Sequence, residues 1–178
     1  SGCTIVVDEA YYEFSGKTVV DLASHYDNLI VVRTFSKAFS MAGIRVGYMI
    51  SSKASTNILN KVRPPNSLSV ISLALAQTAL RDLDTMKKFV EDVVKERERC
   101  IRFLEKSPNL QVYPSEANFI LIKFLKVKAR KAYQRLLEKG LVTRDVSHMP
   151  GLEACLRFSL GLPKENDLLL KALVELAG

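Results

Sequence analysis

Polar residues of types suited to ligand chemistry cluster in the first fifty positions. Asp8 follows the apolar run 3–7, and Tyr11 lies three residues further on. A carboxylate and a phenol therefore come just after one apolar run. Thr34, Ser36 and Lys37 add two hydroxyls and an amine just after a second run. Arg45 follows Lys37 by eight residues and adds a guanidinium, which suits anionic groups.

Three short strands are expected to position these side chains. Residues 3–7, 29–32 and 45–50 are apolar runs bounded by polar residues, which is typical of strands in a largely buried sheet. Ligands of open α/β sheets lie outside the carboxyl ends of the strands. Asp8 and Lys37 each follow such an end, and Arg45 lies at the start of the third strand. We therefore expect these residues to share one site.

The rest of the chain reads as helices followed by a second α/β unit. Helical patterns and stop signals predict helices at 53–62, 67–80, 85–104, 127–139 and from Pro163 onward. Apolar runs predict strands at 110–113, 119–124, 141–143 and 156–160. Gly140 is expected to end its helix in a left-handed cap. The apolar residues of 67–80 and of the last helix are interpreted as core.

Composition narrows the class of protein. Of 178 residues, 48% are hydrophobic and 25% charged, which is ordinary for a globular chain. No apolar stretch is long enough for a membrane span, and the start is not a signal peptide. Three scattered cysteines and two histidines, His25 and His148, indicate neither disulfides nor a metal site, and they favour a cytoplasmic setting. The net charge of +7 suits small anions, since the cations of 87–102 alternate with acids as on a solvated helix.

The strings around the candidate site resemble a known family. They are V-V-D-E-A-Y at 6–11 and R-T-F-S-K-A-F-S-M-A-G-I-R-V-G-Y at 33–48. Both resemble the fold-type I pyridoxal-phosphate (PLP) aminotransferases, and within them the histidinol-phosphate aminotransferase branch. Three later segments agree in order: the S-x-x-N segment ending at Asn118, G-L-V-T-R-D around Arg144 and L-R-F-S-L-G around Arg157. The match covers nearly the whole chain but only the later part of the family's length.

The resemblance implies a role for each residue of the first cluster. Lys37 would form the Schiff base with the cofactor aldehyde and move protons as acid and base. Asp8 would keep the pyridine nitrogen protonated, and Tyr11 would donate to the ring oxygen. The cofactor phosphate would be bound by the hydroxyls of Thr34 and Ser36 and by the guanidinium of Arg45.

On the substrate side the resemblance implies Arg144 and Arg157, with Asn118 beside them. The planar guanidinium of arginine can pair with either a carboxylate or a phosphate. An enzyme of this family must bind both, because glutamate carries carboxylates and the other substrate is a phosphorylated amino alcohol. The implied reaction converts histidinol phosphate and 2-oxoglutarate to imidazole acetol phosphate and glutamate in histidine biosynthesis. The implied assembly is a homodimer, with no nucleic acid, membrane or metal.

The family also implies an α/β architecture in three parts. Residues 1–66 would end the large PLP-binding domain, 67–106 would form linking helices, and 107–178 would be the small C-terminal domain. The family's earlier part supplies further cofactor contacts and a tyrosine from the dimer partner. We therefore expect this chain alone to have little transaminase activity.

Alternatives remain open at this stage. Each residue alone has an ordinary explanation: a surface lysine, a turn aspartate, loop hydroxyls or an ion-pairing arginine. Their joint order favours the PLP enzyme. Threonine-phosphate decarboxylases and aromatic aminotransferases resemble the same branch. A more remote alternative is the aminotransferase-like domain of a transcription regulator, although the chain contains no motif that reads DNA.

Overall fold

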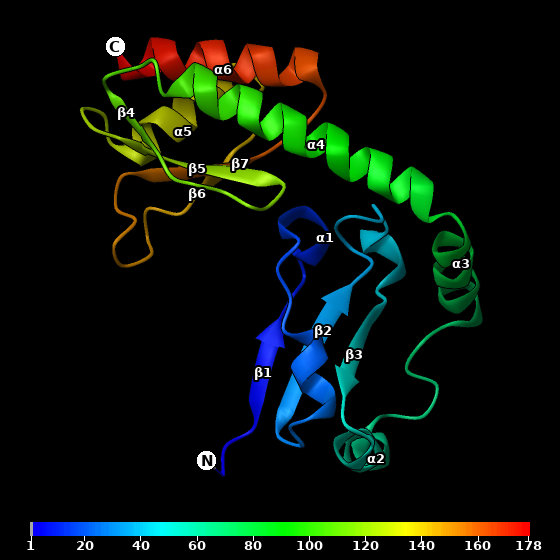
Figure 1. Ribbon diagram of the computed structural model, residues 1–178. Coiled ribbons are helices and arrows are strands. Elements are labelled where there is room, and N and C mark those ends of the chain that lie inside the picture. The colour runs from blue at the N-terminus through cyan, green and yellow to red at the C-terminus, as the bar shows by residue number, and fades with distance from the viewer. Residues whose placement is uncertain (1) are drawn as a thin grey trace. The chain divides into compact units, whose positions relative to one another are not determined.

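The computed structural model describes residues 2–178, which divide into two compact units. Unit 1 ends at Val90 and unit 2 comprises Glu91–Gly178, so the division falls inside the long helix α4 (Leu83–Leu104). The elements of each unit are labelled in Figure 1. The three-part division at 66 and 106 stays a prediction. Within 2–178, no helix is both long and apolar enough to cross a membrane.

Unit 1 is built on a three-stranded sheet whose middle strand is β2. Strand β1 (Ile5–Asp8) runs parallel to β2 (Leu29–Thr34), and β3 (Gly47–Ser51) runs antiparallel to it. Gly47 is required in β3, because a Cβ there would lie 2.9 Å from the backbone oxygen of Arg33. The parallel pairing brings the carboxyl ends of β1 and β2 to the same edge of the sheet, as expected (Figure 1).

The expectation of a largely buried sheet is wrong for two of these strands. Only β2 has buried residues, whereas Ile5 and Val6 of β1 are 50% and 58% exposed. Tyr48 and Met49 of β3 are each 38% exposed. Consecutive residues of a strand point to opposite faces, so the described residues leave both faces of β1 and β3 partly uncovered at these positions.

Short and long helices complete unit 1. Helix α2 (Lys53–Val62) confirms the expected range, and the side chain of Ser52 caps it by accepting from the Ser55 N–H. Three short helices were not predicted, since one turn is too short for a periodic pattern. They are α1 (Tyr12–Ser15), η1 (Val20–Ser24) and η2 (Ala42–Ile44).

Helix α3 (Val70–Arg81) corrects the interpretation of its apolar residues as core. Val70 is 83% exposed and Ile71 is 74% exposed, and only Ala76 of this helix is buried. Within unit 1 the helix packs through small side chains, Ala76 and Ala79, into a cluster around Phe35. Its larger apolar residues are therefore only partly covered among the described residues, and Leu73, Leu75 and Leu80 are 43%, 42% and 51% exposed.

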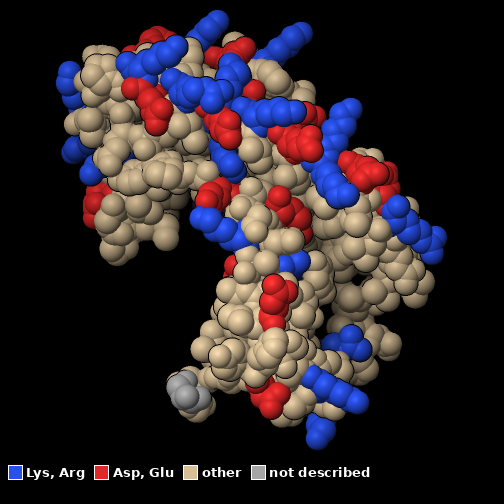
Figure 2. All heavy atoms as spheres, in the orientation of Figure 1, with Lys and Arg blue, Asp and Glu red and all other residues tan. Residues whose placement is uncertain are grey.

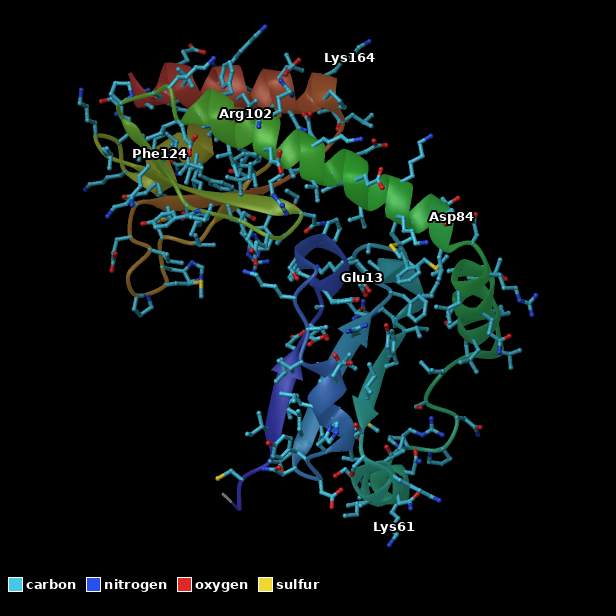
Figure 3. All side chains as sticks on the ribbon, viewed as in Figure 1. Glu13, Lys61, Asp84, Arg102, Phe124 and Lys164 are labelled. Carbon is cyan, nitrogen blue, oxygen red and sulfur yellow. The ribbon has the colours of Figure 1, made fainter. Side chains whose placement is uncertain are left out.

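Unit 2 is an antiparallel sheet covered by helices on one face (Figure 1). The strand order is β4-β5-β7-β6, with bounds Leu110–Val112, Phe119–Phe124, Cys155–Ser159 and Arg144–Asp145. Burial alternates along β5, which places Ile120, Ile122 and Phe124 in the core. The core continues onto α5 (Ala129–Glu138), α6 (Pro163–Ala177) and the later part of α4. Phe124 is labelled in Figure 3.

Most expectations for unit 2 are confirmed, with one exception. The strand at 119–124 and the last helix from Pro163 are present, and Gly140 has the left-handed φ of 74°. The strand expected at 141–143 is wrong. Leu141 N–H donates to Leu136 O in the helix termination, so pairing with β7 begins only at Arg144.

A buried polar network joins α4 and α6 within unit 2. The Asn166 side chain, 2% exposed, donates from Nδ2 to Glu96 Oε1 at 2.8 Å and to Gly161 O at 3.0 Å. Arg99 binds the same carboxylate at 2.7 Å. The hydrogen bond from Arg99 outweighs partial burial and lowers the pKa of Glu96 below its ordinary value. Figure 2 shows acidic and basic side chains interspersed over this outer helical face, as expected for a solvated surface.

Candidate functional site

A pocket of about 380 Å³ lies beyond the carboxyl ends of β1 and β2 in unit 1. Its lining includes one acidic residue, Asp8, and three basic residues, Arg33, Lys37 and Arg45. The residues that line it are Asp8, Ala10, Val32, Arg33, Thr34, Ser36, Lys37 and Arg45. Every residue of the predicted first cluster except Tyr11 is in this lining, and Tyr11 contacts Lys37.

Lys37 is half-buried, and its amine lies beside an aromatic ring. Its Nζ lies 5.4 Å from the centroid of the Tyr11 ring, within the range of a cation–π contact. Tyr11 directly precedes α1, and Lys37 lies in the turn after β2. The contact therefore joins the segments that follow the two parallel strands.

Asp8 is the last residue of β1, and its carboxylate is exposed at the pocket. Its Oδ1 accepts a 2.9 Å hydrogen bond from the backbone N–H of Ala10. This bond fixes the direction of the carboxyl group relative to the end of the strand. The sequence predicted Asp8 at the end of a buried strand, whereas most of β1, an edge strand, is exposed together with Asp8.

The two hydroxyls of the turn after β2 have different surroundings. Thr34 Oγ1 accepts from the Ser36 N–H at 3.0 Å and donates to Val46 O at 3.4 Å. Thr34 thus shapes the turn through backbone partners. Ser36 lines the pocket from the top of that turn. Of the pair, Ser36 is better placed to offer a hydroxyl to a ligand.

Arg45 precedes β3 by two residues and is not in the strand, which corrects the expected position. Its backbone is left-handed, with φ 55° and ψ 43°, and its Nη1 donates to Ala42 O at 2.8 Å. A positive φ is uncommon for a residue with a Cβ, and strained residues often lie at functional sites. This conformation turns the chain so that Arg45 lines the pocket.

An ion pair that the sequence did not predict adjoins these residues, and one of its members, Arg33, lines the pocket. Glu9 and Arg33 are 2.8 Å apart, with side chains only 4% and 10% exposed. Burial alone would raise the pKa of Glu9. The Val19 N–H, the Arg33 guanidinium and the Thr18 hydroxyl together outweigh it, so the pKa lies below its ordinary value. The signal available in the sequence was a charged residue in a strand-like segment, since Arg33 follows four apolar residues.

Lowering the pH is expected to remove the stabilisation that this ion pair provides. Because the pKa of Glu9 is depressed in the folded state, the contribution is complete above the ordinary carboxyl pKa of about 4.3 and is lost as the pH falls through the folded-state value. In the full-length protein, Glu9→Gln should lower the free energy of unfolding by about 2 kcal/mol at pH 7 and by less at pH 3. Denaturant titrations at both pH values measure this difference.

Glu13→Gln is the control for that experiment. Burial raises the pKa of Glu13, whose Oε2 has no hydrogen-bond partner in the described residues. Its stabilising contribution is therefore present below the ordinary carboxyl pKa and is lost as the pH rises through the raised value. The two variants should show opposite trends with pH. A Glu9→Gln penalty that is equal at both pH values would contradict the assignment.

Two arginines of unit 2 lie opposite each other on neighbouring strands. Arg144 of β6 and Arg157 of β7 are Cα partners in the antiparallel register. Like charges directly opposite are destabilising unless an anion lies between them. The Arg157 guanidinium lies 4.9 Å from the centroid of the Phe119 ring, and Arg144 is exposed. Asn118 is half-buried, and its backbone oxygen accepts from the Leu160 N–H.

Comparison with known protein families assigns the chain to one of them. The model of that family, aminotransferase class I and II, matches residues 1–173, so this chain belongs to it. The chain is 45% identical over 172 residues to the histidinol-phosphate aminotransferase of Thermoanaerobacter pseudethanolicus, covering 97% of this chain and 48% of that protein. It is 44% identical over 176 residues to that of Pyrococcus furiosus, covering 98% and 48%. The chain therefore spans about half the length of these curated relatives.

Solved structures agree with the family assignment. The histidinol-phosphate aminotransferase of Clostridium acetobutylicum has a TM-score of 0.89 at 29% identity, covering 98% of this chain and 54% of that one. That of Sinorhizobium meliloti, solved in complex with pyridoxal-5′-phosphate, has a TM-score of 0.85 at 31% identity, covering 98% and 48%. The L-threonine-O-3-phosphate decarboxylase of Porphyromonas gingivalis has a TM-score of 0.86 at 25% identity, covering 97% and 55%.

Proposed function

We propose that the full-length protein is a PLP-dependent aminotransferase that acts on histidinol phosphate and 2-oxoglutarate in histidine biosynthesis. The observation that carries this proposal is the pocket that brings Asp8, Lys37 and Arg45 together at the ends of β1 and β2. Identity of 41–45% to curated histidinol-phosphate aminotransferases supports the choice of substrate. The free thiols of Cys100 and Cys155 suit a cytoplasmic setting.

The lining of the pocket fits the chemical groups of pyridoxal phosphate. Lys37 offers an amine for the aldehyde, and Asp8 offers a carboxylate for the ring nitrogen. Tyr11, which contacts Lys37, is placed to donate to the ring oxygen. Ser36 and Arg45 offer donors for the phosphate, and Thr34 shapes their turn. When bound, the cofactor supplies an electron sink for the carbon that bears the substrate amine.

Lys37 has two tasks in this proposal. It holds the cofactor through its aldehyde before the substrate binds. Once displaced, its amine would accept the proton from the substrate carbon and return it to the former aldehyde carbon of the cofactor. Half-burial beside Tyr11 limits the positions that the flexible lysine side chain can reach. This restriction would favour proton transfer between these two carbons, which are bonded to the same nitrogen.

Arg144 and Arg157 would bind the anionic end of the substrate, with Asn118 beside them. Their paired register supports this role, because an anion would relieve the repulsion between the two guanidinium groups. Arginine accepts a phosphate or a carboxylate with the same fork of donors. One pair of residues is thus suited to histidinol phosphate and to glutamate in turn.

Removing the charge of Arg157 should weaken substrate binding. We expect Arg157→Leu in the full-length protein to lower kcat/KM for histidinol phosphate by about 10²-fold, mainly through KM, because one charged partner of the phosphate is lost. Arg102→Leu is the matched control. Arg102, labelled in Figure 3, is an exposed arginine of unit 2 that forms an ion pair with Glu98. Equal KM values for the two variants would contradict the role of Arg157.

Turnover with three substrates tests the choice of reaction. The full-length protein should transaminate histidinol phosphate faster than phenylalanine and should not decarboxylate threonine phosphate. The decarboxylase alternative is supported by structural neighbours at lower identity, the L-threonine-O-3-phosphate decarboxylase at 25% and a decarboxylase of Sulfurospirillum multivorans at 26%. Release of carbon dioxide from threonine phosphate as the faster reaction would favour that alternative, and preference for phenylalanine would favour an aromatic aminotransferase.

The 178-residue chain alone is expected to have little transaminase activity. It spans 48% of its curated relatives, and α3 exposes Val70 and Ile71 to solvent. We therefore also expect the isolated chain to bind a hydrophobic dye more strongly than the full-length protein does. Rapid transamination by the purified chain would contradict this prediction. A homodimer of the full-length protein is part of the proposal, and light scattering at several concentrations measures it.

A further inference from the structure

We propose that the buried Glu9–Arg33 ion pair is a positioning device that fixes the Asp8 carboxylate relative to the Lys37 amine. Neither side chain is assigned a role by the family strings. Arg33 is among the residues that line the pocket, but its guanidinium bonds Glu9. The inference rests on the proposed PLP chemistry, because it concerns the relative placement of the groups that would bind the cofactor.

The pair joins the two segments that carry those groups. Glu9 is the neighbour of Asp8, and Arg33 is the neighbour of Thr34, where the turn to Lys37 begins. The Glu9 N–H donates to Val32 O at 2.9 Å, which extends the pairing of β1 with β2 one step past Asp8. The backbone and the side chain of Glu9 thus both hold the end of β1 to the end of β2.

Four hydrogen bonds fix the orientation of the Glu9 carboxylate and the Arg33 guanidinium. Arg33 donates to Glu9 Oε2 from Nε at 3.0 Å and from Nη2 at 2.8 Å. Thr18 Oγ1 donates to the same oxygen at 2.9 Å, and the Val19 N–H donates to Oε1 at 2.7 Å. Both carboxylate oxygens are therefore occupied, and the guanidinium has a fixed direction.

A third segment is held by the same guanidinium. The Cζ atom of Arg33 lies 3.6 Å from the centroid of the Tyr12 ring. Tyr12 follows Tyr11, whose ring contacts the Lys37 amine. Arg33 thus links the end of β1, the start of α1 and the turn after β2.

Stability alone does not explain a pair at this location. Buried ion pairs contribute little net stability compared with apolar residues of the same size, because both charges must leave water. They do impose a specific geometry where a site requires it. Arg33 itself lines the pocket and Glu9 is the neighbour of Asp8, so the geometry of the pair has a consequence for function.

The test compares two substitutions of the same type in the full-length apoprotein. Glu9→Gln removes the charge that faces Arg33 at 2.8 Å, and Glu96→Gln removes the charge that faces Arg99 at 2.7 Å in unit 2. Titration with pyridoxal phosphate measures the dissociation constant, and the visible spectrum of the bound cofactor reports its surroundings. Thermal unfolding of each variant shows whether the two lose similar stability.

Glu9→Gln should raise the dissociation constant for pyridoxal phosphate on the order of 10-fold, by analogy with residues that orient metal ligands. It should also shift the absorption maximum of the bound cofactor, whereas Glu96→Gln should change neither. The double variant Glu9→Gln/Arg33→Gln should bind pyridoxal phosphate no more weakly than the weaker-binding single variant does. The two substitutions remove the same contact, so their effects should not add. If Glu9→Gln fails to fold, Arg33→Lys replaces it, because lysine keeps the charge and loses the fork.

The possible results separate the two proposals. Equal dissociation constants and spectra for Glu9→Gln and Glu96→Gln would overturn the positioning role while leaving the proposed function intact. Additive effects of Glu9→Gln and Arg33→Gln would also overturn it. A parent protein that does not bind pyridoxal phosphate would overturn both proposals.

Discussion

Replacing Lys37 by alanine should remove transaminase activity from the full-length protein. The amine both holds the cofactor and moves the proton, and the loss of a positioned acid–base group alone costs about 10²–10⁴-fold in rate. Lys37 lines the pocket with Asp8 and Arg45, and no other lysine is in that lining. The visible absorbance that marks covalent attachment of the cofactor should vanish as well, which is a readout independent of turnover.

The matched control for this prediction is Lys61→Ala. Lys61 is an exposed lysine in the last turn of α2, in the same unit, and is labelled in Figure 3. Its substitution removes the same charge without touching the pocket, so activity and spectrum should match those of the parent protein. Full activity in Lys37→Ala would remove the proposed mechanism, whatever the family resemblance.

Replacing Asp8 by asparagine should leave the cofactor attached and slow the reaction by about 10²-fold. A neighbouring carboxylate raises the pKa of a cationic partner by one to three units, and loss of this effect leaves the ring nitrogen neutral. Asparagine keeps an oxygen that can accept from the Ala10 N–H, so the turn after β1 should persist. The expected signature is a low kcat with covalent attachment retained.

Asp84→Asn serves as the control for the Asp8 substitution. Asp84, labelled in Figure 3, is an almost fully exposed acid in the first turn of α4. It forms an ion pair with Lys87. Its loss should change neither kcat nor the spectrum. An Asp8→Asn protein with the kcat of the parent would contradict the role of the carboxylate at the ring nitrogen.

The positions of the chemical residues could be anticipated because the sequence places them just after apolar runs. Parallel pairing of β1 with β2 then brings Asp8 and the turn of Lys37 to one edge by geometry alone. The left-handed cap at Gly140 and the alternating strand at 119–124 followed from equally local signals. Local backbone chemistry and short periodicity were sufficient for these features.

Features that depend on distant partners could not be anticipated. Glu9 and Arg33 are 24 positions apart, and only the fold makes them a pair. The apolar residues of α3 were interpreted as core, but an apolar side chain does not indicate what covers it. Several of these residues are exposed in the structure, which contradicts that interpretation. Strand β6 has only two residues, and its start depends on how the preceding helix ends.

A crystal structure of the full-length protein with pyridoxal phosphate tests the central claim most directly. We predict a covalent bond between Lys37 Nζ and the aldehyde carbon, with an Asp8 carboxylate oxygen within hydrogen-bond distance of the ring nitrogen. An Asp8 carboxylate too far from that nitrogen to bond it, or attachment of the cofactor to a different lysine, would contradict the account.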